Sequence, residues 1–313
     1  MAIITKLGKE DFENILGNYR IGEYKSHRHL EWALANTVYE LKTTKGKFLL
    51  KIFEKSDPGF INYQIKVIDC LTKYKVPVAG ILKANDKKEL MIYNKKRMLV
   101  QEFVEGKTQE KYNGRLLKDI ARNFGLMSKA LLNLKIQDKS KWKKDYQFKP
   151  YGKIKIKDFT FSMHASKLSG RLRSLNRSKL KRSITHGDFH GANLVVRDNK
   201  LKAIIDFDDS HEDYVSYEIA VFMIDPFIAE KSFDKNLAKI FFKEYQRHVK
   251  LNEEEKKAIY YFVKHRLLGI MAWIDQKKKT HQDHKEKLGK TMNKMISKFN
   301  SFDKTRLEEF IEL

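Results

Sequence analysis

Residues 184–209 read ITHGDFHGANLVVRDNKLKAIIDFDD, and this segment predicts a β-hairpin with polar side chains at its open end. Residues 194–197 and 201–205 are apolar runs of the kind that form strands. Asp198 and Asn199 between them tolerate a tight turn. We therefore expect the residues just before the first strand and just after the second to lie together.

The open end of this hairpin carries one amide and two carboxylates. Asn193 returns to within a residue or two of Asp206, and Asp188 is near enough in sequence to face the same point. Hard oxygen ligands of this kind, few and incomplete, suit Mg²⁺ when the phosphates of a substrate complete its coordination. We predict that Asn193 and Asp206 hold magnesium. Asp188 is the candidate catalytic base, which would orient a substrate hydroxyl toward a γ-phosphate.

Lys51 is a candidate phosphate ligand on a predicted strand. Alternation places it on the same face as Leu49 and Phe53, and an ammonium among apolar neighbours needs a counter-charge. In two-lobed phosphotransfer enzymes that charge is a nucleotide phosphate. The alternative is a lysine at a sheet edge with its stem packed and its head in water. Gln64, the polar member of an apolar face on the next helix, could hydrogen-bond Lys51.

The hydrophobic periodicity divides the chain into a strand-rich and a helix-rich part. Residues before about 105 form strand patterns at 37–43, 47–53, 90–93 and 98–103, with one helix at 60–74. Later residues form helical patterns at 116–134, 217–224, 237–249, 253–277 and 291–313. We predict an α+β fold with a small antiparallel-sheet lobe, residues 1–104, and a larger, mainly helical lobe, residues 105–313, joined by a linker at 101–106.

The composition indicates a cytoplasmic protein with a sizeable core. A chain of 313 residues holds one large domain or two lobes. Cys70 is the single cysteine, which excludes an internal disulfide and points to a reducing compartment. We expect no signal peptide, and apolar runs such as 267–274 are too short to span a membrane.

The chain is strongly basic, with 64 Lys and Arg against 40 Asp and Glu and a net charge of +24. Such a charge attracts polyanions at low salt. The lysines are spread along the whole chain, however, and no nucleic-acid motif is present, so we expect no specific nucleic-acid partner. The densest basic run, residues 170–182, is interpreted as the solvated face of a helix.

Zinc is an alternative to magnesium at these residues. His186 and His190 flank Asp188, and together with the nearby aspartates they could ligate zinc or a metal pair in a metallohydrolase.

No Walker phosphate loop is present, and residues 24–36, where a glycine-rich nucleotide loop would be expected, contain no glycine. Phosphate covering would then use side chains or a wider turn.

The chain resembles the aminoglycoside phosphotransferase and choline kinase superfamily, small-molecule kinases with a protein-kinase-like fold. The likeness rests on residues 184–209, the Lys51 strand, VPV at 76–78 and LVQEFVEG at 99–106. It implies ATP and Mg²⁺ as cofactors and a small-molecule alcohol as substrate. It also implies these roles: Asp188 as catalytic aspartate, Asn193 and Asp206 as magnesium ligands, Lys51 as phosphate lysine, and the backbone around Gln101 to Phe103 as the adenine-binding segment.

Three departures from the superfamily pattern are notable. Gln64 stands where many relatives have the glutamate that pairs with the lysine, Ser128 stands where a histidine often ends the first helix of the large lobe, and Glu218 replaces a common aspartate. Within the superfamily, the opening residues and the segment 35–55 are most similar to bacterial homoserine kinases of this fold. Aminoglycoside, choline and sugar kinases of the same fold remain alternatives, as does a basic binding protein with a decayed kinase fold.

A homoserine-like amino alcohol needs partners for its amine and its acid. Asp208, Asp209 and Glu212 follow the metal hairpin and are the candidate partners of the amine. Arg266 is the candidate partner of the acid, although it could equally be a surface arginine on a packed helix. Trp273 on the same helix could form one wall of the pocket. The sequence does not distinguish ATP from GTP or a monomer from a homodimer.

Overall fold

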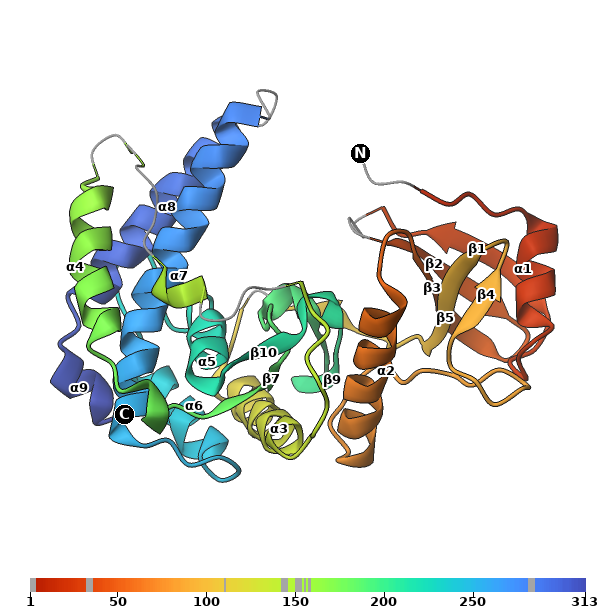
Figure 1. The fold of residues 1–313 in the computed structure, drawn as a ribbon, viewed down its shortest axis with the longest axis horizontal. Helices are drawn as coiled ribbons and strands as arrows, with labels where there is room; N and C mark the ends of the chain where they lie inside the picture. The colour runs from red at the N-terminus through yellow and green to blue at the C-terminus, as the bar shows by residue number, and fades with distance from the viewer. Residues whose placement is uncertain are drawn as a thin grey trace. The chain divides into compact units, whose positions relative to one another are not determined.

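The computed structural model describes residues 4–31, 36–109, 111–141, 146–149, 154, 156, 159–280 and 285–313. It divides the chain into two compact units. The first comprises Met1–Gly106 and Lys202–Ile205, and the second comprises Lys107–Leu201 and Asp206–Leu313. A small antiparallel sheet and a helix-rich part are both present, which confirms the predicted α+β class (Figure 1).

The first unit is built on a five-stranded sheet in the order β1-β2-β3-β5-β4. Its strands are β1 (Tyr24–His29), β2 (Thr37–Thr43), β3 (Gly46–Phe53), β4 (Met91–Tyr93) and β5 (Lys96–Glu102). All neighbouring pairs are antiparallel, and Lys51 in β3 lies opposite Val38 in β2 and Leu99 in β5. The two predicted strand pairs are confirmed.

Each face of this sheet packs against one helix. Leu50 and Ile52 join the cluster of buried side chains that contains Phe12 of α1 (Lys9–Leu16). Phe53 and Leu99 lie in a second cluster with Ile61 and Ile65 of α2 (Pro58–Lys73). Residues opposite each other in neighbouring strands share a face, so Lys51, paired with Leu99, lies on the α2 side of the sheet.

The start of α2 follows directly from its sequence. The Asp57 carboxylate accepts hydrogen bonds from the backbone N–H groups of Gly59 and Phe60, and proline occupies the first helical turn. Gln64 is buried on this helix among apolar neighbours, as its register predicts. One expectation in this unit was wrong: Tyr24–His29 is an edge strand and no loop. Its side chains are mostly exposed, so no apolar alternation marked it as a strand.

The second unit combines long helices with short strands. Its helices are α3 (Gly114–Leu132), α4 (Phe161–Arg173), α5 (Val215–Met223), α6 (Lys235–Tyr245), α7 (Glu253–Thr280), α8 (Lys285–Asp303) and α9 (Leu307–Ile311). Its strands are β6 (Lys107–Thr108), β7 (Arg182–Thr185), β8 (Leu194–Arg197) and β10 (His211–Tyr214), together with the start of β9 (Lys200–Ile204), whose residues from Lys202 onward belong to the first unit. β7 pairs with β10, and β6, β8 and β9 form a three-stranded sheet. Helix α7 packs against α4, α5, α8 and α9 (Figure 1).

The predicted hairpin of residues 194–205 is present as β8 and β9. Asp198 and Asn199 connect the strands with φ angles of 56° and 54°, the left-handed values that a two-residue hairpin turn requires. Asn and Asp tolerate this region better than other residues with a side chain. The turn therefore follows from the sequence.

Two helix boundaries differ from the predictions. The basic run 170–182 is mostly not helical, because α4 ends at Arg173 and β7 begins at Arg182. Leu172, Leu175 and Leu180 are nonetheless buried, so their spacing reflected burial and not a continuous helix. The stretch 291–313 is two helices, α8 and α9. Among the described helices, none combines the length and the apolarity needed to cross a membrane.

An aromatic cluster forms the centre of the second unit. Phe124 of α3 stacks on Phe189 with ring centroids 4.1 Å apart, and the edges of Phe222 and Tyr245 meet the same ring. Phe124, Phe189 and Phe222 are completely buried. Because Phe189 directly follows Asp188, this cluster also fixes the segment that carries the candidate base.

We predict that Phe124→Ala lowers the free energy of unfolding by about 3–5 kcal/mol, because the deletion leaves a cavity among aromatic rings that cannot collapse. Urea-induced unfolding followed by circular dichroism measures this loss. The control is Met163→Ala at a 58 % exposed position of the same unit, which should change stability by less than about 0.5 kcal/mol. A loss below about 1 kcal/mol for Phe124→Ala would show that the cluster repacks.

Candidate active site

The candidate site is built on the loop that follows strand β7. The strand ends at Thr185, His186 is completely buried, and Gly187 turns the chain with a φ of +84°. A Cβ atom on Gly187 would lie 2.1 Å from the carbonyl oxygen of Asp209. Only glycine fits this turn, and the turn presents Asp188 at the surface of the unit.

The Asp188 carboxylate receives donors on both oxygens. His190 Nε2 lies 3.0 Å from Oδ2, and Arg266 Nη2 of α7 lies 3.3 Å from Oδ1. Asn193 Nδ2 donates to the backbone oxygen of Asp188 at 2.9 Å and reaches Oδ2 at 3.4 Å. Burial raises the pKa of Asp188, but the hydrogen bond from His190 and the charges of His190 and Arg266 outweigh it, so the pKa lies below its usual value. The carboxylate is therefore ionised at neutral pH.

Asn193 and Asp206 lie at the same end of the β8–β9 hairpin, as predicted. Asn193 closes the short helix η3 (Gly191–Asn193) immediately before β8. Its amide nitrogen is used by Asp188, which leaves the amide oxygen as the atom able to ligate a cation. Asp206 has a left-handed backbone (φ 65°, ψ 70°), which is uncommon for a residue with a side chain.

The acidic groups around this point repel one another. Asp208 and Asp209 follow Asp206 in the short helix η4 (Phe207–Asp209). Burial raises the pKa of Asp209, and the charges of Asp188, Asp206 and Asp208 raise it further. A bound divalent cation would relieve this repulsion, so one amide oxygen and one carboxylate fit Mg²⁺, which keeps most of its coordination for water and phosphate.

The zinc alternative is not supported by the same residues. The ring of His186 is buried against Phe207, with centroids 4.6 Å apart, and its Nδ1 accepts the backbone N–H of Asp188. His190 is engaged with the Asp188 carboxylate. Within the described parts of the chain, no group of three or more His, Cys, Asp or Glu side chains is arranged to hold a metal ion.

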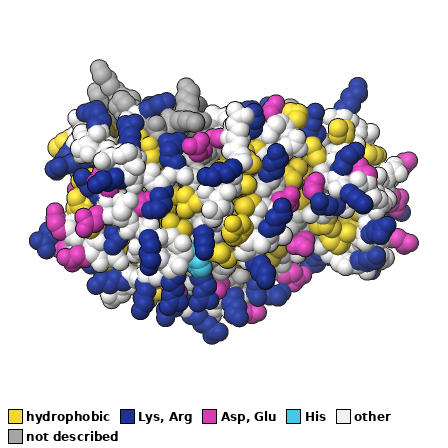
Figure 2. All heavy atoms as spheres, turned by 60° about the horizontal axis from the view of Figure 1, so that its bottom comes forward, with side chains coloured by type: hydrophobic (Ala, Val, Ile, Leu, Met, Phe, Trp, Pro, Cys, Tyr) yellow, Lys and Arg dark blue, Asp and Glu magenta, His cyan; other side chains and the backbone are white. Residues whose placement is uncertain are grey.

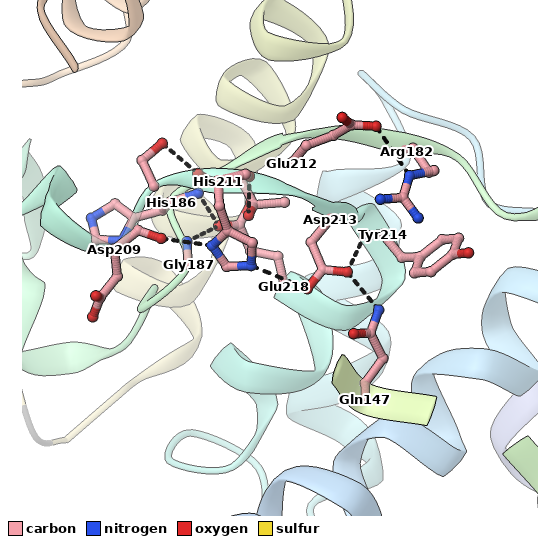
Figure 3. A network of polar contacts seen from close by, with 12 residues as sticks. Gln147, Arg182, His186, Gly187, Asp209, His211, Glu212, Asp213, Tyr214 and Glu218 are labelled. Carbon is pink, nitrogen blue, oxygen red and sulfur yellow. Dashed lines mark hydrogen bonds and ion pairs between the residues drawn. The ribbon is translucent and has the colours of Figure 1, made fainter. Parts of the chain in front are cut away.

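Glu218 of α5 supports the loop from beneath. Its Oε1 accepts hydrogen bonds from the backbone N–H groups of His186 and Gly187, the second at 3.1 Å (Figure 3). Burial raises the pKa of Glu218 to about 8, although the two hydrogen bonds oppose this shift. The sequence marked Glu218 only as a departure from a common aspartate, and its role as acceptor for the loop emerges from the structure.

A second set of polar contacts ties β10 to β7 and to the helices (Figure 3). The two nitrogens of His211 contact the Asp209 carbonyl at 2.7 Å and the Asp213 carboxylate at 3.3 Å. Gln147 Nε2 donates to the same carboxylate at 2.6 Å, and Thr185 Oγ1 donates to the His211 carbonyl at 2.9 Å. These bonds hold the Asp209 carbonyl against Gly187.

The predicted substrate residues have different surroundings. Glu212 forms an ion pair with Arg182 at 3.1 Å (Figure 3). Asp208 and Asp209 are partly buried beside Asp206. Arg266 is no isolated surface arginine, because it reaches the Asp188 carboxylate. Trp273 is 54 % exposed.

The predicted nucleotide residues belong to the first unit, which we describe separately. Lys51 Nζ lies 5.3 Å from the centre of the Phe53 ring. Gln101 pairs with Leu49 in the sheet, and its side chain donates to the Ala79 carbonyl at 3.3 Å. Phe103 lies beyond the end of β5, and Lys47 is placed over its ring. The roles of these residues and of Gln64 remain predictions.

Curated relatives of this chain are homoserine kinases. The homoserine kinase of Bradyrhizobium diazoefficiens is 23% identical over 266 residues, which cover 83% of this chain and 81% of the relative. The homoserine kinase of Zymomonas mobilis is 22% identical over 284 residues, which cover 87% of this chain and 89% of the relative.

Solved structures similar to this one are small-molecule kinases. An amicoumacin kinase in complex with AMP-PNP, Ca²⁺ and Ami superimposes with a TM-score of 0.72 at 18% identity, covering 95% of this chain and 98% of that one. A microcompartment-associated aminopropanol kinase gives a TM-score of 0.68 at 14% identity, covering 96% and 98%. At these identities the likeness concerns the fold, and it confirms the predicted protein-kinase-like class.

The pattern that defines the phosphotransferase enzyme family matches residues 27–256 of this chain. The match spans well over half of the sequence and includes the strand of Lys51 and the loop of Asp188. The predicted resemblance is confirmed: this chain belongs to the phosphotransferase enzyme family and is a small-molecule kinase.

Proposed function

We propose that this protein is an ATP- and magnesium-dependent kinase that phosphorylates the hydroxyl of a small amino alcohol, with homoserine as the favoured substrate. The observation that carries the proposal is the Asp188 carboxylate, held in the ionised form by His190 and Arg266 and bonded to Asn193. Catalysis in this class rests on positioning and electrostatics.

Asp188 would act on the acceptor substrate. Its ionised carboxylate would accept the hydrogen bond of the substrate hydroxyl and take up the proton as the hydroxyl oxygen bonds to the γ-phosphorus and the bond from that phosphorus to ADP breaks. His190 and Asn193 would keep the carboxylate oriented during this step. Glu218 would keep the backbone beneath it in place.

For the metal and the nucleotide we propose the roles that the sequence predicts. Asn193 and Asp206 would hold Mg²⁺, which supplies positive charge to the phosphate oxygens when bound. Lys51 would contact the phosphates, and the backbone from Gln101 to Phe103 would contact the adenine. The amicoumacin kinase that holds AMP-PNP and Ca²⁺ supports the use of a nucleotide and a divalent cation.

The substrate assignment rests on charge as well as on the relatives. Asp208 and Asp209 are carboxylates beside the metal hairpin, and the raised pKa of Asp209, caused by burial and by neighbouring carboxylates, supports binding of a cationic amine there. Arg266 provides a guanidinium next to the base for the acid group of the substrate. Glu212 is less suited to the amine, because Arg182 already neutralises it. An aminoglycoside, choline or a sugar remains the alternative substrate.

We predict that Asp188→Asn lowers phosphoryl transfer by about a hundredfold to ten-thousandfold, because the amide cannot take the hydroxyl proton. Nucleotide binding should stay close to that of the parent protein. Steady-state turnover of ATP with homoserine and nucleotide titration measure the two effects. Asp198→Asn, at an 82 % exposed turn position, is the matched control and should leave both unchanged. Turnover within about threefold of the parent would remove Asp188 from the mechanism.

We expect Asp206→Ala to abolish activity, because it removes a charged magnesium ligand. Asn193→Ala should weaken activity less, since asparagine is a neutral ligand. Both variants should need more magnesium to reach half-maximal rate, which a magnesium titration at fixed ATP measures. A metal requirement equal to that of the parent in both variants would place the cation elsewhere.

Arg266→Ala should show whether Arg266 binds the carboxylate of the substrate or acts only by holding the Asp188 carboxylate. For homoserine, the loss of a charged contact worth roughly 1.5–3 kcal/mol predicts a rise in KM of about tenfold to a hundredfold. For 3-aminopropan-1-ol, which lacks the carboxylate, KM should stay near its parent value. An equal loss with both substrates would show that Arg266 acts only through Asp188, and a failure of homoserine to stimulate ATP turnover would discard this substrate.

A further inference from the structure

A cavity of about 420 Å³ lies within the second unit, among helices α4 and α7 and the segment that connects α8 to α9. Its size is that of a small-molecule site. From α4 it is lined by His164, Lys167, Leu168 and Arg171, whose spacing places them along one side of the helix. Figure 1 shows the elements that surround it.

This cavity is separate from the Asp188 site. Helix α7 contributes Tyr260, Tyr261 and Lys264 to the cavity, whereas Arg266 of the same helix reaches Asp188. Two residues along a helix point roughly 200° apart, so Lys264 and Arg266 lie on opposite sides of α7. The cavity therefore does not belong to the site of phosphoryl transfer.

Part of the cavity lining is apolar. Leu168, Tyr260, Tyr261 and Phe299, each at most 7 % exposed, form what we call its apolar floor. The Tyr260 hydroxyl donates to the Thr305 carbonyl at 2.7 Å, which fixes the α8–α9 connection against α7. Such a floor suits the carbon skeleton of an organic molecule.

The rim of the cavity carries an excess of positive charge. Five lysine and arginine side chains line it against two carboxylates: Lys167, Arg171, Lys264, Lys304 and Arg306 against Asp303 and Glu308. Lys264 is neutralised by Asp303 at 2.6 Å, and Arg306 by Glu309 at 2.6 Å. Lys167, Arg171 and Lys304 have no ion-pair partner in the described parts of the chain. Figure 2 shows basic side chains spread widely over one face of the molecule, so positive charge alone does not single out the cavity.

We propose that this cavity is a second ligand site, which binds a small organic phosphate through Lys167, Arg171 and Lys304. Lys167, Arg171 and Lys304 carry three positive charges against the one negative charge of Glu308, and the two positive charges that remain match a phosphate monoester. A guanidinium binds phosphate oxygens in a bidentate manner. The apolar floor receives the rest of the molecule. The inference goes beyond the proposed function and does not depend on it.

The environment of His164 favours its neutral form, so this side chain adds no further positive charge to the cavity. Burial lowers the pKa of His164, and the charges of Lys167 and Lys264 lower it further, although Asp303 opposes them. Its ring stacks on Phe159 with centroids 5.0 Å apart, which leaves it at the wall of the cavity as a neutral group.

Labelling with pyridoxal 5′-phosphate tests the proposal on the full chain. This probe is itself a small organic phosphate with a ring, and its aldehyde condenses with a lysine amine; borohydride then reduces the imine to a stable adduct. Peptide mapping reads out which lysines react. We expect Lys167 and Lys304 to be labelled about tenfold faster than Lys290, a 79 % exposed lysine of α8, because binding raises the local concentration of the aldehyde.

Arg171→Gln should slow the labelling of Lys167 and Lys304 to the rate of an ordinary exposed lysine. ATP turnover should stay at the parent value. Arg173→Gln is the matched control, because Arg173 lies on the same helix, bonds to Ser169 and does not line the cavity. O-phosphohomoserine and ADP should compete with the label, and the one effective at lower concentration identifies the source of the phosphate. Labelling of Lys167 and Lys304 no faster than Lys290, or competition by inorganic phosphate alone, overturns the proposal.

Discussion

The site depends on one buried carboxyl group. The backbone N–H groups of His186 and Gly187 turn inward beneath Asp188, where water cannot satisfy them, and Glu218 accepts both. An unsatisfied buried donor costs about 1–3 kcal/mol, so the turn would not hold its shape without this acceptor. The pKa of about 8 means that Glu218 is largely protonated at neutral pH. A neutral carboxyl still offers its carbonyl oxygen as acceptor, so burial of Glu218 places no uncompensated charge in the core.

Asp188, the residue that follows Gly187, has the opposite protonation state. Asp188 is ionised because donors reach both of its oxygens, and Glu218 is neutral because it is buried away from water. Environments that separate the pKa values of neighbouring carboxyl groups assign them different roles. In the proposed function the ionised group would face the substrate, and the neutral group supports the backbone. The close contact between Gly187 and the Asp209 carbonyl joins both to the acidic hairpin end.

Local patterns in the sequence predicted much of this arrangement. Contacts between residues that are far apart in the sequence could not be predicted. The β8–β9 hairpin followed from apolar runs around Asp198 and Asn199, and α2 followed from Asp57 and the periodicity that buries Gln64. Strand β1 was missed, because an exposed edge strand needs no apolar alternation. The contact of Arg266 with Asp188 joins residues 78 positions apart, and the pairing of Glu212 with Arg182 joins residues 30 positions apart. Sequence spacing carries no information about such pairs.

The charge of the whole chain and the charge of its site have opposite signs. A net charge of +24 would repel a cationic substrate. Asp206, Asp208 and Asp209 nevertheless lie together at one hairpin end, where the charges of the first two raise the pKa of Asp209 and a bound cation would relieve the repulsion. Fields of exposed lysines are screened within about 8 Å at physiological salt, whereas the partly buried carboxylates act at short range. In the proposed function, a metal ion would satisfy part of this acidic cluster, and the amine of a zwitterionic substrate would satisfy the rest. Arg266, the one described cation that bonds to Asp188 from a distant helix, would then supply the complementary charge that distinguishes an amino acid from a simple amine.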